Sequence, residues 1–171
     1  MQLGLRYGEL FQMSYITRDI NAAVEHARTE LGIDNFHVSE AIAEVMSEGR
    51  VQELVLNAAI ANIGRHQFEI LEPISGPIHF YTDNVDLDSH ILNFHHIAIA
   101  VTGGHDNWMK LLDEVKASGD PFAFSFPAEP SPDDQLAFCY VDTRKRLGHF
   151  TEYLWWAEAL NDMPSVPRLK A

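Results

Sequence analysis

Apolar residues along the chain switch between two periods, and the switches divide each half into one helix and several strands. Residues Leu10 to Ile16 read as a strand, and apolar positions then recur every three or four residues from Ile20 to Leu31. That spacing is typical of an amphipathic helix packed on a sheet. Thr17 or Asp19 can cap this helix and Gly32 can end it. Three strand-like segments follow, at about Asn35 to Ala41, Val51 to Ile63 and His66 to Leu71.

The second half of the chain repeats this order. Phe94 to Thr102 reads as a strand, and Asp106 or Asn107 can cap a helix that stops near Gly119. The apolar side of this helix carries Trp108, Leu111, Leu112 and Val115, and strands are then expected at about Phe122 to Phe126, Gln135 to Val141 and His149 to Trp155. Each half is therefore strand, helix, strand, strand, strand, so we expect an α+β fold of two tandem βαβββ modules.

The expected organisation has four parts. The first module covers residues 8–76 and the second covers residues 93–157. A linker, residues 77–92, follows the break at Glu72 to Pro77 and includes a possible extra strand at Ile78 to Tyr81. The tail, residues 158–171, is expected to form a short helix before Pro164. The two modules are predicted to make one compact unit.

Composition excludes several classes of protein. The formal net charge is −13, from 25 acidic and 12 basic residues, and such a surface repels nucleic acids and anionic membranes. The one cysteine, Cys139, lies in an apolar run and is predicted to be buried, and a single cysteine cannot form an intrachain disulfide. The N-terminus has no signal-peptide pattern, and no apolar stretch approaches the ~20 residues that span a bilayer. A cytoplasmic protein is the expectation.

Four polar side chains stand at matching points of the repeat. Gln12 corresponds to His96 on the two opening strands, and Glu69 corresponds to Glu152 on the two closing strands, at nearly equal offsets along the chain. Side chains alternate faces along a strand, so His96 shares its face with the small residues Ala98 and Ala100, which leaves room for a ligand. A carboxylate flanked by apolar residues is costly to bury without a partner. Two of them at equivalent positions indicate a shared cation.

These strands carry a resemblance to a known superfamily. The segments Phe94-His95-His96-Ile97-Ala98-Ile99-Ala100-Val101, Phe68-Glu69-Ile70-Leu71-Glu72-Pro73 and Gly148-His149-Phe150-Thr151-Glu152-Tyr153 resemble those of the vicinal oxygen chelate superfamily, over about Leu10 to Trp156. Its members include glyoxalase I, methylmalonyl-CoA epimerase, extradiol dioxygenases and bleomycin-resistance proteins. The resemblance implies a glyoxalase-like fold, in which two modules form a curved mixed-sheet cup around one divalent metal, and commonly a homodimer. It also implies a ligand set of Gln12, Glu69, His96 and Glu152.

This ligand set favours a metal-dependent lyase or isomerase. One imidazole, one amide and two carboxylates suit Zn, Mn, Ni, Co or Mg. Such a metal stabilises the enolate of a small carbonyl or thioester substrate, and Glu152 or Glu69 can move the proton, as the resemblance to glyoxalase I implies. Glu53 resembles the third-strand base of methylmalonyl-CoA epimerases, but its spacing to Glu69 differs by about one residue, so a surface position is favoured.

Other readings stay open. Ile16 and Pro73 stand where glyoxalase I has its glutathione-binding arginine and asparagine, so glutathione recognition is not expected. A CoA ester would need cationic contacts for its phosphates, and the turn Arg144-Lys145-Arg146 is the segment that could supply them. A non-catalytic, small-molecule-sequestering protein of the bleomycin-resistance type is the main alternative. A dioxygenase is a weaker hypothesis, because the four positions do not contain the two histidines and one carboxylate that bind iron in nonheme oxygenases. His95 and His149 alternate to the other face of their strands, where a packing or supporting role is expected. Several strand aromatics suggest an apolar or aromatic substrate, although ordinary core packing explains them as well: Phe94, Phe122, Phe138, Tyr140, Phe150 and Tyr153.

Overall fold

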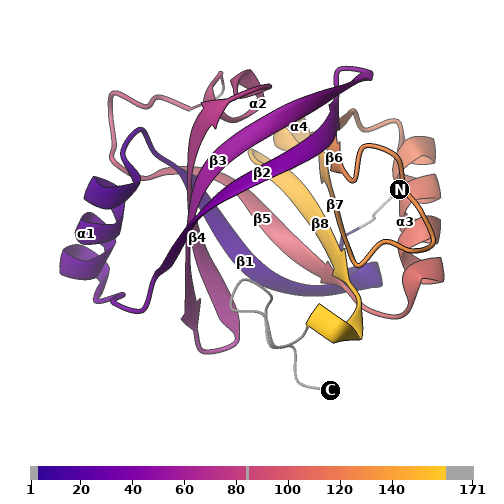
Figure 1. Cartoon of the computed structure of the whole chain (residues 1–171), viewed down its shortest axis with the longest axis horizontal. Helices are drawn as coiled ribbons and strands as arrows, with labels where there is room; N and C mark the ends of the chain where they lie inside the picture. Colours follow the sequence, from indigo (N-terminus) through magenta and orange to yellow (C-terminus); the bar gives the residue numbers. More distant parts are fainter. Residues whose placement is uncertain (1–3, 84, 161–171) are drawn as a thin grey trace.

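The computed structural model describes residues 4–83 and 85–160, and within these ranges eight strands close into one barrel (Figure 1). The order around the barrel is β1-β4-β3-β2-β6-β7-β8-β5, which confirms the α+β fold with a curved mixed sheet. The strands are β1 Gly8–Ile16, β2 His37–Ser47, β3 Arg50–Ile63, β4 His66–Ser75, β5 Asn93–Val101, β6 Phe122–Phe126, β7 Leu136–Val141 and β8 Phe150–Trp156. The helices are α1 Ile20–Leu31, α2 His79–Thr82, α3 His105–Ser118 and α4 Arg144–Leu147, with 3-10 turns η1 Gly4–Tyr7 and η2 Glu158–Leu160.

The strand register reproduces the repeat read from the sequence. Within the first module β1 runs parallel to β4, and Ser14 stands opposite Glu69. Within the second module β5 runs parallel to β8, and Ala98 stands opposite Glu152. Ser14 corresponds to Ala98 in the repeat as Glu69 does to Glu152, so the two pairs are equivalent. The modules then join through the antiparallel pair β1–β5, so the opening strands of the two modules lie side by side.

Two long helices cover the outside of the barrel at opposite ends of the view in Figure 1, one for each module. Helix α1 begins as expected, because the Asp19 carboxylate accepts a hydrogen bond from the Ala22 amide, and it ends at Gly32 in the left-handed conformation. The buried faces of α1 and α3 pack on strand residues that point outward from the barrel. Because the helices take the outward apolar residues, the alternate residues of each strand are left to line the interior.

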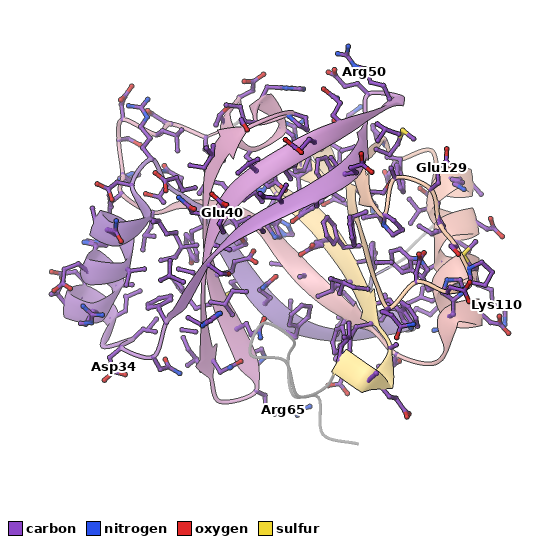
Figure 2. All side chains as sticks on the ribbon, in the orientation of Figure 1. Asp34, Glu40, Arg50, Arg65, Lys110 and Glu129 are labelled. Atoms are coloured by element: carbon purple, nitrogen blue, oxygen red, sulfur yellow. The ribbon has the colours of Figure 1, made fainter. Side chains whose placement is uncertain are left out.

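The barrel is closed weakly on one side. Strands β2 and β6 pair only through Met46 with Ser125 and Ser47 with Phe124. The first half of β2 is exposed on both faces: Ala41, which stands opposite the buried Leu56, is open to solvent, and Ile42 is 61% exposed. Strand β2 thus diverges from β6 beyond these two pairs. Charged residues such as Asp34, Arg65 and Lys110 lie on the outer surface (Figure 2).

The linker does not contain the expected extra strand. Residues from Ile78 onward form the single helical turn α2, held by hydrogen bonds from the Tyr81 and Thr82 amides to the Ile78 carbonyl. A strand would point Phe80 and Tyr81 to opposite faces, whereas the helical turn buries both in one apolar cluster with Phe124, Tyr140 and Phe150. This cluster fills one end of the barrel.

Four further expectations concern the turn after β7, the length of β2, the tail and Cys139. The turn after β7 contains the helical turn α4, and β2 is longer than expected, because its register with β3 continues to Ser47. The tail begins with the 3-10 turn η2, and Pro164 lies outside the described residues. Cys139 is fully buried, as predicted. No helix in the described ranges has both the length and the apolar character needed to cross a membrane.

Candidate active site

Three of the four predicted ligands meet inside the barrel. His96 on β5 is fully buried, and its Nε2 lies 3.6 Å from Oε2 of Glu69 on β4 and 3.4 Å from Oε2 of Glu152 on β8. The two carboxylates come from different modules and face the same imidazole nitrogen. This convergence follows from the central position of β1 and β5, each of which is flanked by the closing strand of its own module.

Gln12 lies beside this group, one pair further along the strands. It stands opposite Ala98, whereas Ser14 stands opposite His96. The Gln12 amide donates to Gln67 Oε1 at 3.3 Å, and the Gln67 amide donates to Asn62 Oδ1 at 3.2 Å. The structure therefore places Gln12 in a chain of three amides that leads from the carboxylates toward the end of the barrel opposite α2.

Glu69 is the most perturbed carboxyl of the site. Its side chain is 12% exposed, and removal from water raises the pKa of Glu69 to about 7. His96 opposes this increase in the pKa, Glu152 adds to it by charge repulsion, and the adjacent Ser14 and Gln12 side chains oppose it. Both Glu69 Oε2 and Ser14 Oγ are buried atoms without a hydrogen-bond partner among the described residues. A buried carboxylate oxygen in this state indicates a site that a cation, a proton or a ligand completes.

Two tyrosines join the site. Tyr140 on β7 places its hydroxyl 3.4 Å from His96 Nε2, and it also hydrogen bonds with Tyr81 of α2. Burial, followed by the negative charge of Glu152, raises the pKa of both phenols well above the ordinary value, so both remain protonated donors. Tyr140 points inward from a predicted strand and was one of the strand aromatics that the sequence suggested for an apolar or aromatic substrate. No periodic signal pointed to Tyr81, because its place depends on α2.

His95 also reaches the site, although strand alternation predicted that it would turn away. At the β1–β5 pair, Ser14 stands opposite His96 and Tyr15 opposite Phe94, so His95 is the extra residue of a β-bulge. Its Nδ1 lies 3.0 Å from His96 Nδ1. Phe11, at the corresponding point of the first module, is the extra residue of an equivalent bulge in β1. Bulges re-aim side chains beside sites, and a single sequence gives no sign of them. Burial, followed by the nearby His96, lowers the pKa of His95 to about 3.

The remaining candidates lie away from this group. Glu53 is exposed and stands opposite Glu44, as its surface reading predicted, and Ile16 is part of the apolar core. His149 is half-buried, and its Nδ1 contacts the Phe150 carbonyl at 2.7 Å. In α4, Arg144 pairs with Asp142 at 2.6 Å and Arg146 pairs with Asp120. Of the strand aromatics, Phe138, Tyr140 and Phe150 lie in the interior cluster, Tyr153 packs with α3, and Phe94 and Phe122 are partly exposed.

The donor set is suited to a divalent metal, but it is not preassembled. Two ligands of a tetrahedral zinc ion, each about 2.0–2.2 Å from the metal, stand about 3.3–3.6 Å apart. The distances from His96 Nε2 to Glu152 and Glu69 are of this size. No group of three or more His, Cys, Asp or Glu residues in the described ranges is already arranged to hold a metal ion. Binding would therefore require the carboxylates to adjust around the ion.

Comparison with known proteins gives the fold. No family model and no curated protein sequence matches the chain. Methylmalonyl-CoA epimerase from Mycobacterium tuberculosis matches with a TM-score of 0.55 at 13% identity, covering 90% of each chain. A methylmalonyl-CoA epimerase in complex with methylmalonyl-CoA and NH4+ matches with a TM-score of 0.53 at 16% identity, covering 89% of this chain and 96% of that one. A hypothetical protein from Bacillus halodurans C-125 matches with a TM-score of 0.53 at 20% identity, covering 88% and 96%. The chain thus has the glyoxalase-like fold of these epimerases, as the sequence resemblance implied.

Proposed function

We propose that this protein is a metal-dependent isomerase or lyase, most simply an epimerase, that removes the proton beside a carbonyl of a small carbonyl or thioester substrate. The observation that carries the proposal is the meeting of Glu69 and Glu152 at His96 Nε2, with Oε2 of Glu69 buried and making no hydrogen bond among the described residues. Two methylmalonyl-CoA epimerases with the same fold, one of them bound to methylmalonyl-CoA, support the choice of reaction class.

Glu69, His96 and Glu152 would hold the metal, with Gln12 as a weaker fourth ligand one pair away. When bound, a divalent ion supplies a Lewis acid that lowers the cost of forming an enolate. The choice among Zn, Mn, Ni, Co and Mg stays a prediction, because imidazole with carboxylate oxygens suits all of them.

The chain's own residues supply the proton transfers. A substrate whose acidic carbon lies beside Glu69 would give its proton to that carboxylate once Glu69 loosens from the metal, and the C–H electron pair would move into the enolate. Glu152 comes from the opposite module, so a protonated Glu152 that has left the metal would return its proton to the carbon from a different direction and invert the configuration. Solvent would then take the proton from Glu69 and restore the one on Glu152. The buried phenols of Tyr140 and Tyr81, which hydrogen bond with each other and stay protonated, would supply one hydroxyl hydrogen where negative charge develops on the substrate oxygen.

Metal content and proton exchange test this function together. Purified protein is analysed for bound metal before and after loading with each candidate ion, and a panel of carbonyl and thioester compounds is followed by NMR for deuterium uptake from D₂O. We expect one metal per chain and exchange at one carbon, with His96→Gln and Glu152→Gln losing both. Glu53→Gln removes the same charge as Glu152→Gln from an exposed strand position and should change neither. Failure to load any divalent metal would refute the proposal.

A sequestering protein is the second candidate, and an apolar wall inside the barrel favours it. Phe11, Ala98 and Ala100 form this wall, which continues to the partly buried Leu154 and Trp156. An apolar or aromatic ligand could pack on the wall without a metal. This function predicts ligand binding that survives both chelator treatment and Glu152→Gln, whereas the isomerase requires the metal and both carboxylates.

A further inference from the structure

His95 is held rigidly between the linker and β8. It is 3% exposed, its ring stacks on Phe150 with centroids 4.8 Å apart, and the ring of Phe80 meets it edge-on at 5.2 Å. The bulge in β5 turns it toward His96, and the two imidazole rings are perpendicular. Both nitrogens of His95 therefore have fixed neighbours.

Those neighbours determine where the protons lie. His95 Nε2 is 3.3 Å from the Phe80 carbonyl, which can only accept, so Nε2 carries a hydrogen. His95 Nδ1 faces His96 Nδ1 at 3.0 Å, a contact that needs one hydrogen between the two nitrogens.

The shared hydrogen belongs on His96. If His95 held it, His95 would be an imidazolium enclosed by aromatic rings, and the carboxylates of the site approach His96 Nε2 instead. The Arg144 guanidinium, 4.4 Å above the Phe150 ring, adds positive charge on the same side. His96 therefore donates from Nδ1 to His95, and its Nε2 is the nitrogen that faces Glu69, Glu152 and the Tyr140 hydroxyl.

We propose that His95 is a positioning residue, which, anchored by the Phe80 carbonyl, accepts a hydrogen bond from Nδ1 of His96 and so leaves Nε2 as the His96 nitrogen that faces the carboxylates and binds a metal ion. This inference rests on the proposed function for its purpose, but the tautomer itself does not depend on any activity. It also gives the linker a role: one turn of helix, α2, contributes the carbonyl that sets the chemistry of a histidine on β5. Such supporting hydrogen bonds orient metal-binding histidines and increase their basicity.

The tautomer is measured on the whole, chelator-treated protein by long-range ¹H–¹⁵N NMR at pH 8, with His96→Gln used to assign the His96 signals. The wild-type protein should show Nδ1 of His96 protonated, whatever the state of Nε2 beside the two carboxylates. A neutral His96 with its only hydrogen on Nε2, and none on Nδ1, would overturn the proposal. This arm needs no variant of His95, so it decides the question even if such variants do not fold.

Two variants then test the cause. His95→Phe keeps an aromatic ring but removes both nitrogens, so His96 should change to the Nε2–H tautomer and Zn²⁺ affinity should fall by about 10–100-fold. His95→Asn keeps an acceptor oxygen near the position of Nδ1 and should retain the Nδ1–H tautomer, with at least partial rescue of Zn²⁺ affinity. A His95→Phe protein that folds and retains the wild-type tautomer would refute the role of His95. If no divalent metal binds the wild type, the proposed function fails while the tautomer result still stands or falls by itself.

Discussion

Replacing Glu69 with glutamine should stabilise the metal-free protein at alkaline pH. The carboxyl of Glu69 is removed from water, and its Oε2 makes no hydrogen bond among the described residues. These surroundings raise its pKa to about 7 in the folded state. In the unfolded chain the pKa returns to its usual 4.5. The folded state therefore binds the extra proton between these values.

The sign and size of the effect follow from that difference. Glu69 contributes its full stability below pH 4.5, where it is protonated in both states, and the contribution is lost as pH rises through 7. At about 1.4 kcal/mol for each pH unit, the ionised carboxylate costs the folded state about 3 kcal/mol above pH 7, of which about 2.5 kcal/mol is lost between pH 5 and pH 8.5. Glutamine does not titrate, so the Glu69→Gln protein should not lose this stability of about 2.5 kcal/mol as the pH rises.

The assay is urea unfolding of chelator-treated wild type and variant at pH 5 and pH 8.5. The free energy of unfolding of Glu69→Gln, relative to wild type, should increase by about 2.5 kcal/mol from the lower to the higher pH. Glu53→Gln removes the same charge from an exposed position and should change by less than about 0.5 kcal/mol. A change below about 1 kcal/mol for Glu69→Gln would show that Glu69 is not held in a costly ionised state.

Three further substitutions test the fold around the site. Gly8→Ala would place its Cβ 1.8 Å from the Ala100 carbonyl oxygen across the β1–β5 pair, so it should destabilise the protein by about 3 kcal/mol or more. The control Gly104→Ala has no atom within 4 Å of the added Cβ and should cost under about 0.5 kcal/mol. Equal free energies of unfolding in urea would contradict the strand register. Leu111→Ala on the buried face of α3 should cost about 2–5 kcal/mol, whereas Leu31→Ala, 55% exposed, should cost less than about 1; similar losses would mean that α3 does not pack as described. Tyr81→Phe keeps the ring in the aromatic cluster but removes the hydrogen bond to Tyr140. Thermal and urea unfolding should show a loss of stability of about 1 kcal/mol, and the proton-exchange activity should fall. Unchanged stability and activity would exclude a role for the phenol pair.

Sequence periodicity was sufficient for most of the fold. The helices at Ile20–Leu31 and His105–Ser118 lie where three- and four-residue spacing placed them, and the Asp19 cap and Gly32 end are as expected. The expected cap of the second helix was wrong, because Gly104 precedes its first residue and both Asp106 and Asn107 lie inside the helix. Local rules work here because capping and amphipathic packing depend on near neighbours in the chain. They failed at Ile78 to Tyr81, where alternation fits a strand and a helical turn equally well and only burial in the barrel end selects the turn.

The repeat also brought together the three side chains that matter most. Nearly equal offsets along the chain matched Gln12 with His96 and Glu69 with Glu152, and the strand register preserves both matches. Repetition carries this information because equivalent positions of two similar modules face the same interior. Gln12 kept its predicted strand position, but its amide is engaged with Gln67, a contact that only the paired strands define.

The sequence by itself determined the two-module fold and the strand positions of Glu69, His96 and Glu152, because strand alternation and an internal repeat are written in residue order, and the pairing of β1 with β5 brought the three side chains together. Tertiary structure decided what surrounds them. A bulge turned His95 inward, α2 supplied the Phe80 carbonyl and Tyr81, and β7 brought Tyr140 to His96. These contacts join segments far apart in the chain, or depend on one extra residue in a strand, and no local pattern of hydrophobic and polar positions encodes either.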